Sequence, residues 1–146
     1  MASSPTGEYD HLREALRESE SRFRTLFENS PLPLMEIDLY EVRKYLDHLK
    51  GSGVRDLRLH FERYPQEIQK CLELVRVIDA NHQTLKLLGV SSREVLKSNF
   101  SKFFTKESLL PLKNQLLAVY ANKSAYEAEM VGSRLNGEYV HALLRW

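Results

Sequence analysis

The sequence predicts a mixed α+β fold, in which an antiparallel sheet is flanked by short helices and preceded by an amphipathic helix. Three observations indicate it. Apolar residues recur at helical spacing in residues 9–26, a β-branched run lies at residues 75–78, and Asn136-Gly137 is a strong hairpin signal. The chain has 146 residues, 42% of them hydrophobic, which is enough for one domain with a hydrophobic core.

Residues 9–26 carry a stripe whose members alternate in spacing between three and four residues, as in a heptad repeat. Its members are Tyr9, Leu12, Leu16, Ser19, Phe23 and Leu26. Ser19 weakens the stripe, and only about two and a half heptads are present, fewer than the roughly three or four that identify a coiled coil securely. Two interpretations stay open: a helix that packs on its own domain, and a dimerising signal helix that arrives from an upstream module. Residues 1–7 are small and polar, and we expect them to form a tail.

Residues 32–38 predict a first strand, and three short amphipathic helices follow it. Asp38 is expected to cap the first helix, Asp56 begins the second and Pro65 begins the third. The three apolar faces consist of Val42, Tyr45, Leu46 and Leu49, then Leu57, Phe61 and Tyr64, then Ile68, Cys71, Leu72 and Val75. Cys71 is the only cysteine, and its position on such a face predicts a small buried hydrophobe and not a nucleophile.

The β-branched run at residues 75–78 predicts the second strand, next to the first in the sheet. Asn81 is expected to cap the helix that follows, because its side-chain oxygen can accept an unpaired backbone N–H group. Gly89 is expected to end that helix in a left-handed conformation, and Ser91 or Ser92 to cap the next one. The stretch thus predicts a strand followed by two short capped helices.

The rest of the chain predicts an aromatic linker at residues 99–104, a longer helix at 106–121 and two final strands. The strands, at 124–135 and 138–146, flank the Asn-Gly turn and form a hairpin.

This order of elements resembles the PAS sensory domain family, and the lead-in Arg22-Phe-Arg-Thr-Leu-Phe-Glu-Asn-Ser-Pro31 is similar to that of PAS domains in bacterial signalling proteins. The stretch with Asn81 and Gly89 resembles the same family. The resemblance covers residues 20–146. It implies a tail and a signalling or dimerisation helix at residues 1–20, and a PAS-like domain at 21–146 with a helical insertion at 38–74, between the first two strands.

The family has five antiparallel strands, whereas this sequence shows four. The resemblance implies that the missing fifth strand lies between the first and the fourth, and that the domain is truncated at its C-terminus. Its absence leaves two unpaired strand edges, which favours strand addition or exchange. We expect another segment, from this chain or from a neighbouring one, to cover the gap.

A PAS-like fold implies an apolar pocket between the aromatic linker, the long helix and the inner face of the sheet. It holds a small organic ligand or is filled by its own side chains, and His141 is either a polar group of the pocket or a satisfied core residue. The candidate lining residues are Met35, Ile37, Val77, Leu85, Phe100, Phe103, Phe104, Leu116, Met130 and His141.

The sequence shows no catalytic set and no metal-ligand spacing among its five histidines, so we expect neither an enzyme nor a metal site. The titratable residues nearest to such a set are Glu36, Asp38, Asp79 and His141. Flavin-binding PAS domains carry a cysteine after the second strand, whereas Cys71 precedes it. Haem-binding members often use a histidine of the long helix, and residues 106–121 contain none. We therefore expect no flavin and no haem.

The net charge of +1 gives no electrostatic signature of nucleic-acid or acidic-membrane binding. No apolar run reaches the ~20 residues of a membrane span. The PAS resemblance implies a cytoplasmic sensory or regulatory module of a bacterial histidine kinase or diguanylate cyclase, homodimeric through its N-terminal helix. It binds a small ligand or a partner and relays the change to an output domain. The alternative is a PAS module that binds no ligand and serves dimerisation or protein interaction.

Overall fold

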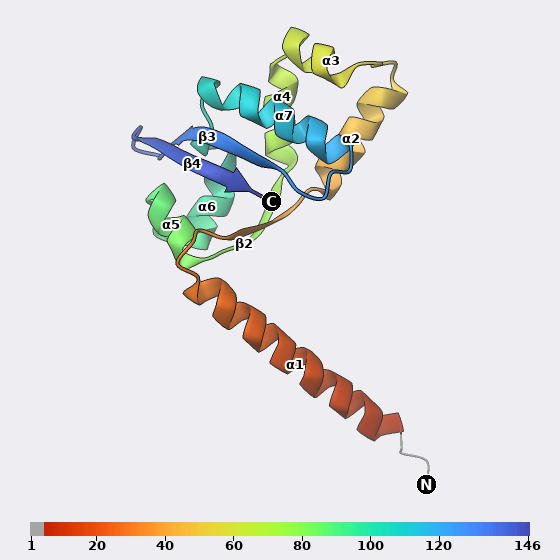
Figure 1. The fold of residues 1–146 in the computed structure, drawn as a ribbon, viewed down its shortest axis with the longest axis vertical. Coiled ribbons are helices and arrows are strands. Elements are labelled where there is room, and N and C mark those ends of the chain that lie inside the picture. Colours follow the sequence, from red (N-terminus) through yellow and green to blue (C-terminus); the bar gives the residue numbers. More distant parts are fainter. Residues whose placement is uncertain (1–4) are drawn as a thin grey trace.

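A computed structural model of the protein describes residues 5–146 and shows a mixed α+β fold (Figure 1). Its elements, in chain order, are α1 (Pro5–Asn29), β1 (Met35–Asp38), α2 (Tyr40–Gly51), α3 (Leu57–Arg63), α4 (Gln66–Leu74), β2 (Arg76–Ala80), α5 (His82–Leu88), α6 (Arg93–Asn99), the 3-10 helices η1 (Phe100–Phe103) and η2 (Lys106–Ser108), α7 (Leu109–Tyr120), β3 (Glu127–Ser133) and β4 (Tyr139–Arg145).

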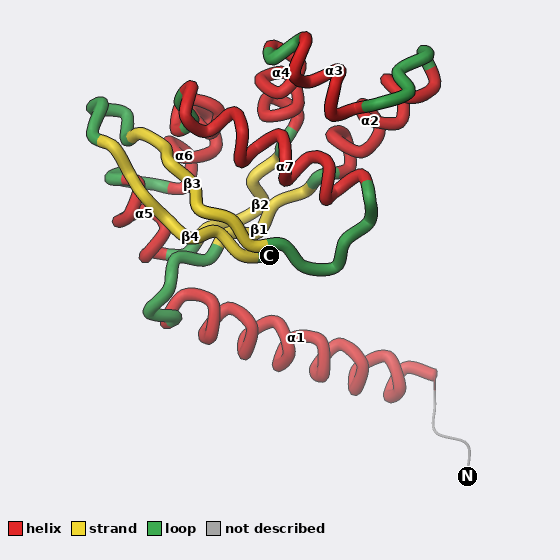
Figure 2. The backbone as a smooth tube through the Cα atoms, turned by 45° about the horizontal axis from the view of Figure 1, so that its top comes forward, coloured by secondary structure: helices red, strands yellow, loops and turns green. Residues whose placement is uncertain are grey.

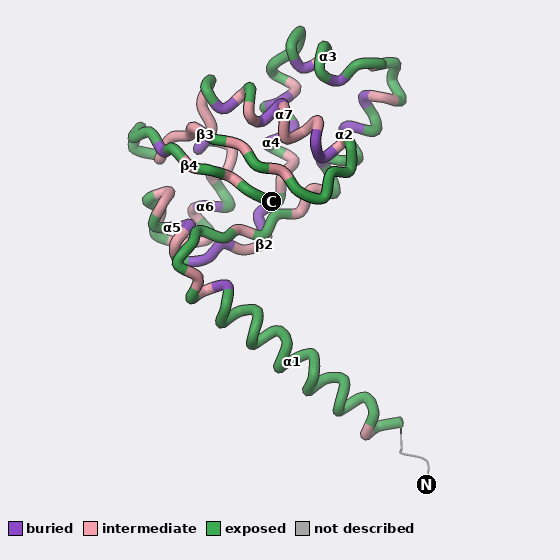
Figure 3. The backbone as a smooth tube through the Cα atoms, in the orientation of Figure 1, coloured by how far each residue is buried: buried purple, intermediate pink, exposed green. Residues whose placement is uncertain are grey.

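Helix α1 projects away from the rest of the molecule, which we call the body (Figure 1). Phe27 is the only buried residue among its 25, so almost the whole helix is coloured as exposed in Figure 3. The expected tail is wrong for residues 5–7, which are helical, because proline suits a first helical turn. Residues 1–4 of that tail lie outside the described residues.

The four expected strands are present, but they form two separate antiparallel pairs instead of one sheet (Figure 2). β1 pairs with β2 and is irregular between Glu36 and Ile37, and β3 pairs with β4 across a tight turn. Within residues 5–146, β1 pairs only with β2 and β4 pairs only with β3. No strand therefore joins the two pairs into one sheet. No segment of the described chain fills the gap, and a neighbouring chain in that place stays a prediction.

The helices between the first two strands belong to the main core of the body. α2, α3 and α4 gather with α7 on one side of the β3–β4 pair, while α1 leaves on the other (Figure 1). The largest fully buried side chains of this cluster are Phe61, Leu46, Val42 and Cys71, and Cys71 is a buried hydrophobe as expected. A second, smaller cluster surrounds Val77 and Leu96 beside β2, α5 and α6.

The helix ends follow the expected capping residues. The side chain of Asn81 accepts a 3.1 Å hydrogen bond from the Thr84 backbone N–H and caps α5, and Gly89 ends α5 with a φ of 67°. Ser92, one of the two serines considered, caps α6, and Asp56 caps α3. Only the first helix of the insertion differs. Its N-cap is Leu39, although the Asp38 carboxylate still accepts a bond from the Tyr40 N–H.

Candidate functional site

The residues expected to line a pocket divide between the two clusters. Met130 is buried in the larger cluster, and Leu116 packs against it. Val77, Leu85 and Phe103 are buried in the smaller cluster, with Met35 packed against them. Phe100 and Phe104, whose rings meet edge to face at 5.2 Å, pack against both clusters and fill the space between them. Eight of the ten candidates therefore belong to packed core.

Ile37 and His141 lie outside both clusters. Ile37 is 40% exposed, because the irregularity after Glu36 shifts the pairing of β1 at this residue. His141 does not face the interior, since burial alternates along β4 and places Val140, Ala142 and Leu144 inward and His141 outward. The structure therefore does not place His141 among the apolar groups of a pocket.

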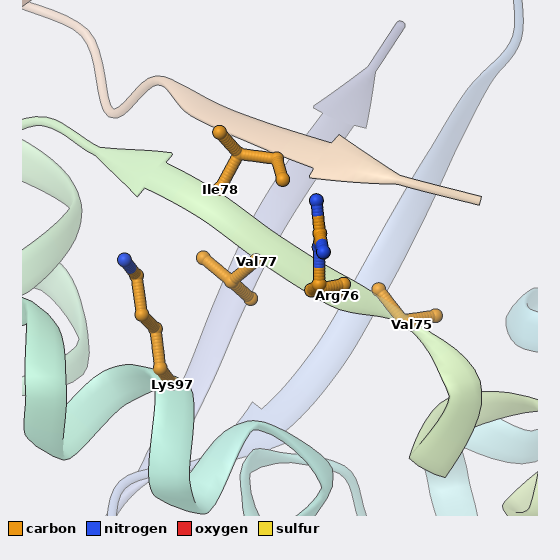
Figure 4. A pocket seen from close by; sticks show the side chains of 5 residues that line it. All are labelled: Val75, Arg76, Val77, Ile78 and Lys97. Atoms are coloured by element: carbon orange, nitrogen blue, oxygen red, sulfur yellow. The ribbon is translucent and has the colours of Figure 1, made fainter. Parts of the chain in front are cut away.

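A surface hollow lies elsewhere, beside β2, and has a volume of about 370 Å³. Figure 4 shows its lining residues, which are Val75, Arg76, Val77, Ile78 and Lys97, and only Val77 belongs to the expected set. The Arg76 guanidinium lies 3.6 Å from the Asp38 carboxylate. The hollow is an open depression with two cationic side chains at its edge.

Asn81 ties α1 to the body. It is fully buried, and its side-chain amide nitrogen donates 2.9 Å hydrogen bonds to the backbone oxygens of Phe27 and Leu32. Its side-chain oxygen accepts bonds from the backbone N–H groups of Leu34 and Thr84. One side chain thus connects the last turn of α1, the loop after it and the first turn of α5. Because it uses its full donor and acceptor capacity, no smaller residue can replace it.

A group of charged residues surrounds the same place. The Arg93 guanidinium of α6 donates a 2.9 Å hydrogen bond to the Asp79 carboxylate and a 2.8 Å bond to the Ala80 carbonyl oxygen. It also donates to the Glu28 carboxylate at the end of α1. Arg24 of α1 lies 3.7 Å from the second Asp79 oxygen. We call Glu28, Asp79, Asn81 and Arg93 the α1 joint.

The apolar stripe of α1, which we call the seam, keeps the six residues predicted from the sequence and does not pack on the body. Its large members are 56% to 72% exposed, so the interpretation of a helix packed on its own domain is wrong for this structure. At its body end, the ring of Phe23 in the seam stacks on the buried ring of Phe27 at 5.5 Å. The seam therefore continues into the core through one pair of aromatic rings.

The titratable candidates do not converge on one point. Asp79 is held in the α1 joint, Glu36 is exposed on β1, and His141 is exposed on the other strand pair. Burial raises the pKa of the Cys71 thiol to about 12, with the Glu67 carboxylate adding to the shift, so the thiol stays protonated. Within residues 5–146, no three histidine, cysteine or acidic side chains group closely enough to hold a metal ion. No helix in that part of the chain has the length and apolar character needed to cross a bilayer.

Comparison of the chain with protein-family models, with curated proteins and with solved structures gave no match.

From the sequence, Asn81 is predicted only as a helix cap and Asp79 only as a titratable candidate, while Glu28 and Arg93 are not predicted to be functional. The contacts of Asn81 with Phe27 and Leu32 span about fifty positions of the chain, and no local pattern predicts them. Glu28 and Arg93 lie within the two stretches that carry the PAS resemblance, but nothing in the sequence pairs them. The joint is the set of contacts that holds the last turn of α1 to the body.

Proposed function

We propose that the chain is a sensory or regulatory module of a bacterial signal-transduction protein, and that α1 relays changes between the body and the rest of that protein. The single observation that carries the proposal is the attachment of α1. The helix is exposed over most of its length and held to the body at its last turn, through a buried amide and a set of ion pairs. An output domain such as a histidine kinase or a diguanylate cyclase receives the change.

The α1 joint suits such a relay because its members come from separate elements. Asn81 and Asp79 belong to β2 and the turn after it, Arg93 to α6, and Glu28 to α1. A ligand or partner that moves β2 or α6 changes the bonds that fix the direction of α1. Such coupling requires that the ligand or partner bind two conformations of the body with different affinity.

A second candidate is an interaction module that binds no small ligand. It is favoured by the packing of the expected pocket residues, eight of which belong to the two core clusters. Dimerisation through α1 is then the whole function, and the body serves to fix the ends of the helices.

Thermal-shift screening of the full chain with metabolites separates the two candidates. A ligand that binds the folded body raises the unfolding midpoint by mass action. Hydrogen exchange of the complex then tests the relay, because a relayed change alters protection at residues 22–34, around the joint. A ligand that changes hydrogen-exchange protection only within the body, and not at residues 22–34, contradicts the relay. A screen that finds no stabilising metabolite favours the interaction module.

A further inference from the structure

We propose that the seam of α1 docks against the seam of a second copy of this chain in a parallel two-stranded coiled coil. The inference rests on the proposed function, since it names the partner of the helix that relays the change. The seam is an apolar stripe that the body leaves uncovered, and it runs from Tyr9, 68% exposed, to Leu26, 72% exposed. An exposed apolar stripe of this kind marks an interaction surface.

The spacing of the seam suits a second helix of the same kind. Its six positions alternate by three and four residues, so Tyr9, Leu16 and Phe23 take the a positions of a heptad and Leu12, Ser19 and Leu26 the d positions. Each side chain then packs between four residues of the facing helix. A helix that docks on a sheet or in a groove needs a broader apolar face than these two positions supply.

The charges beside the seam are complementary to those of an identical helix. In a parallel pair, residues at the g position face residues five places later, at the e position of the partner. Glu8 takes a g position and Arg13 the following e position, so each Glu8 faces Arg13 of the other copy, twice by symmetry. Among residues 5–146 neither side chain has an ion pair within its own chain, so both are open to a partner. A partner of unrelated sequence has no reason to match them.

The polar position of the seam favours the parallel direction. In a parallel pair Ser19 meets Ser19 of the other copy in one layer, where the two hydroxyls can hydrogen-bond. In an antiparallel pair each Ser19 meets Leu16, so two layers combine a hydroxyl with an apolar side chain. The body also leaves the last layer accessible, since Leu26 stays exposed although Phe27 beside it is buried. Two bodies can therefore lie side by side at the same end of the coiled coil.

Sedimentation equilibrium of the full chain tests the inference with a matched pair of variants. Leu16 in the seam and Leu59 on α3 are both 60% exposed and both helical. We expect the wild type and Leu59→Asp to be dimers and Leu16→Asp to be a monomer with an unchanged unfolding midpoint of the body. A wild type that stays monomeric up to its solubility limit overturns the inference, as does a Leu16→Asp variant that still dimerises. If both variants stay dimeric and only a substitution on β4 abolishes the dimer, the interface lies on β4. That result also overturns the inference.

Charge reversal tests the direction of the helices. Arg13→Glu replaces both attractive contacts with repulsive ones in either direction, because Arg13 faces Glu8 in a parallel pair and Glu20 in an antiparallel pair. We expect it to weaken the dimer by roughly tenfold. Adding Glu8→Arg restores the dimer only in the parallel arrangement. If Arg13→Glu weakens the dimer and the added Glu8→Arg does not restore its affinity, the parallel direction is overturned.

Failure of this inference and failure of the proposed function give different results. A monomeric chain whose α1 still changes protection when a ligand binds keeps the relay and excludes the coiled coil. A seam dimer whose α1 never responds to any stabilising ligand keeps the coiled coil and excludes the relay.

Discussion

The side-chain amide of Asn81 donates a 2.9 Å hydrogen bond to the backbone oxygen of Phe27, 54 positions earlier in the chain. Phe27 is also the one residue of α1 that is buried. The helix is thus held at the same point by a packed ring and by a buried amide, and the Arg93 guanidinium adds an ion pair to Glu28 beside it. We expect these contacts to fix the direction in which α1 leaves the body.

Replacing Asn81 with alanine removes the cap of α5 and both amide bonds, and leaves the oxygens of Phe27 and Leu32 without that donor. We expect the free energy of unfolding to fall by about 2–4 kcal/mol, since one capping residue and two buried hydrogen bonds are lost. Urea denaturation measures it. The exposed neighbour His82 is the control, and His82→Ala should change stability by less than about 0.5 kcal/mol. Equal effects of the two substitutions contradict the role given to Asn81.

Arg93→Gln keeps much of the side-chain length but removes the charge that Asp79 and Glu28 share. We expect a loss of about 1–2 kcal/mol, because these carboxylates are partly buried and lose their common cation. Lys97, one turn further along α6, is exposed and forms no ion pair in the described structure, so Lys97→Gln is the matched control. Hydrogen exchange should also rise in the last turn of α1 for Arg93→Gln alone, and unchanged exchange there contradicts the joint.

Gly132 allows β3 to approach the aromatic linker. A Cβ at this position would lie 2.6 Å from the Phe103 backbone oxygen, too close for any side chain, and Gly132 pairs with Phe104 in an isolated bridge. We expect Gly132→Ala to destabilise the protein by about 1–3 kcal/mol through the backbone shift that it forces. A Cβ at Gly51 meets nothing within 4 Å, so Gly51→Ala should leave stability unchanged or raise it. The thermal midpoints of the two variants should therefore move apart, and a similar shift in both would show that the close approach does not exist.

The buried Cys71 thiol predicts a pH dependence of stability. Its pKa rises from about 9 when unfolded to about 12 when folded, so the folded state binds the proton more tightly. The stabilisation is complete below pH 9 and is lost as pH increases through the interval up to 12, where the unfolded thiol ionises first. The free energy of unfolding of Cys71→Ala, measured by urea titration, should decline less steeply with pH over that interval. The native thiol should also react with iodoacetamide only after unfolding, and rapid labelling of the native chain contradicts its burial.

Much of the fold follows from local sequence patterns. The cap at Asn81, the left-handed Gly89 and the presence of a hairpin at Asn136-Gly137 depend on a few neighbouring residues, so the sequence alone predicts them. The sequence left Ser91 and Ser92 as alternative caps of α6, and the hairpin loop holds Leu135 as well as Asn136 and Gly137, since Arg134 and Glu138 bond across it. The separation of the strands into two pairs follows because no strand of the described chain lies between β1 and β4. Local sequence patterns do not predict such long-range pairing.

The candidate site was predicted less completely. The residues chosen for a pocket mostly lie in or against the two core clusters, but hydrophobicity does not distinguish a side chain that lines a cavity from one that fills it. The seam was recognised because its spacing is periodic, and its exposure required the structure. The bonds of Asn81 to Phe27 and of Arg93 to Glu28 join distant segments, so only the folded chain shows them.

The most direct test of the central claim, that the joint fixes the direction of α1, is a distance distribution between α1 and the body. Spin labels at Glu18→Cys on α1 and Ser98→Cys on α6 occupy exposed positions outside the seam and the joint, and the buried Cys71 stays unlabelled in the native chain. Excess unlabelled protein restricts the signal to pairs within one chain. We predict one narrow distribution for this pair and a much broader one when Asn81→Ala is added. A distribution that is equally broad with and without Asn81 would contradict the claim.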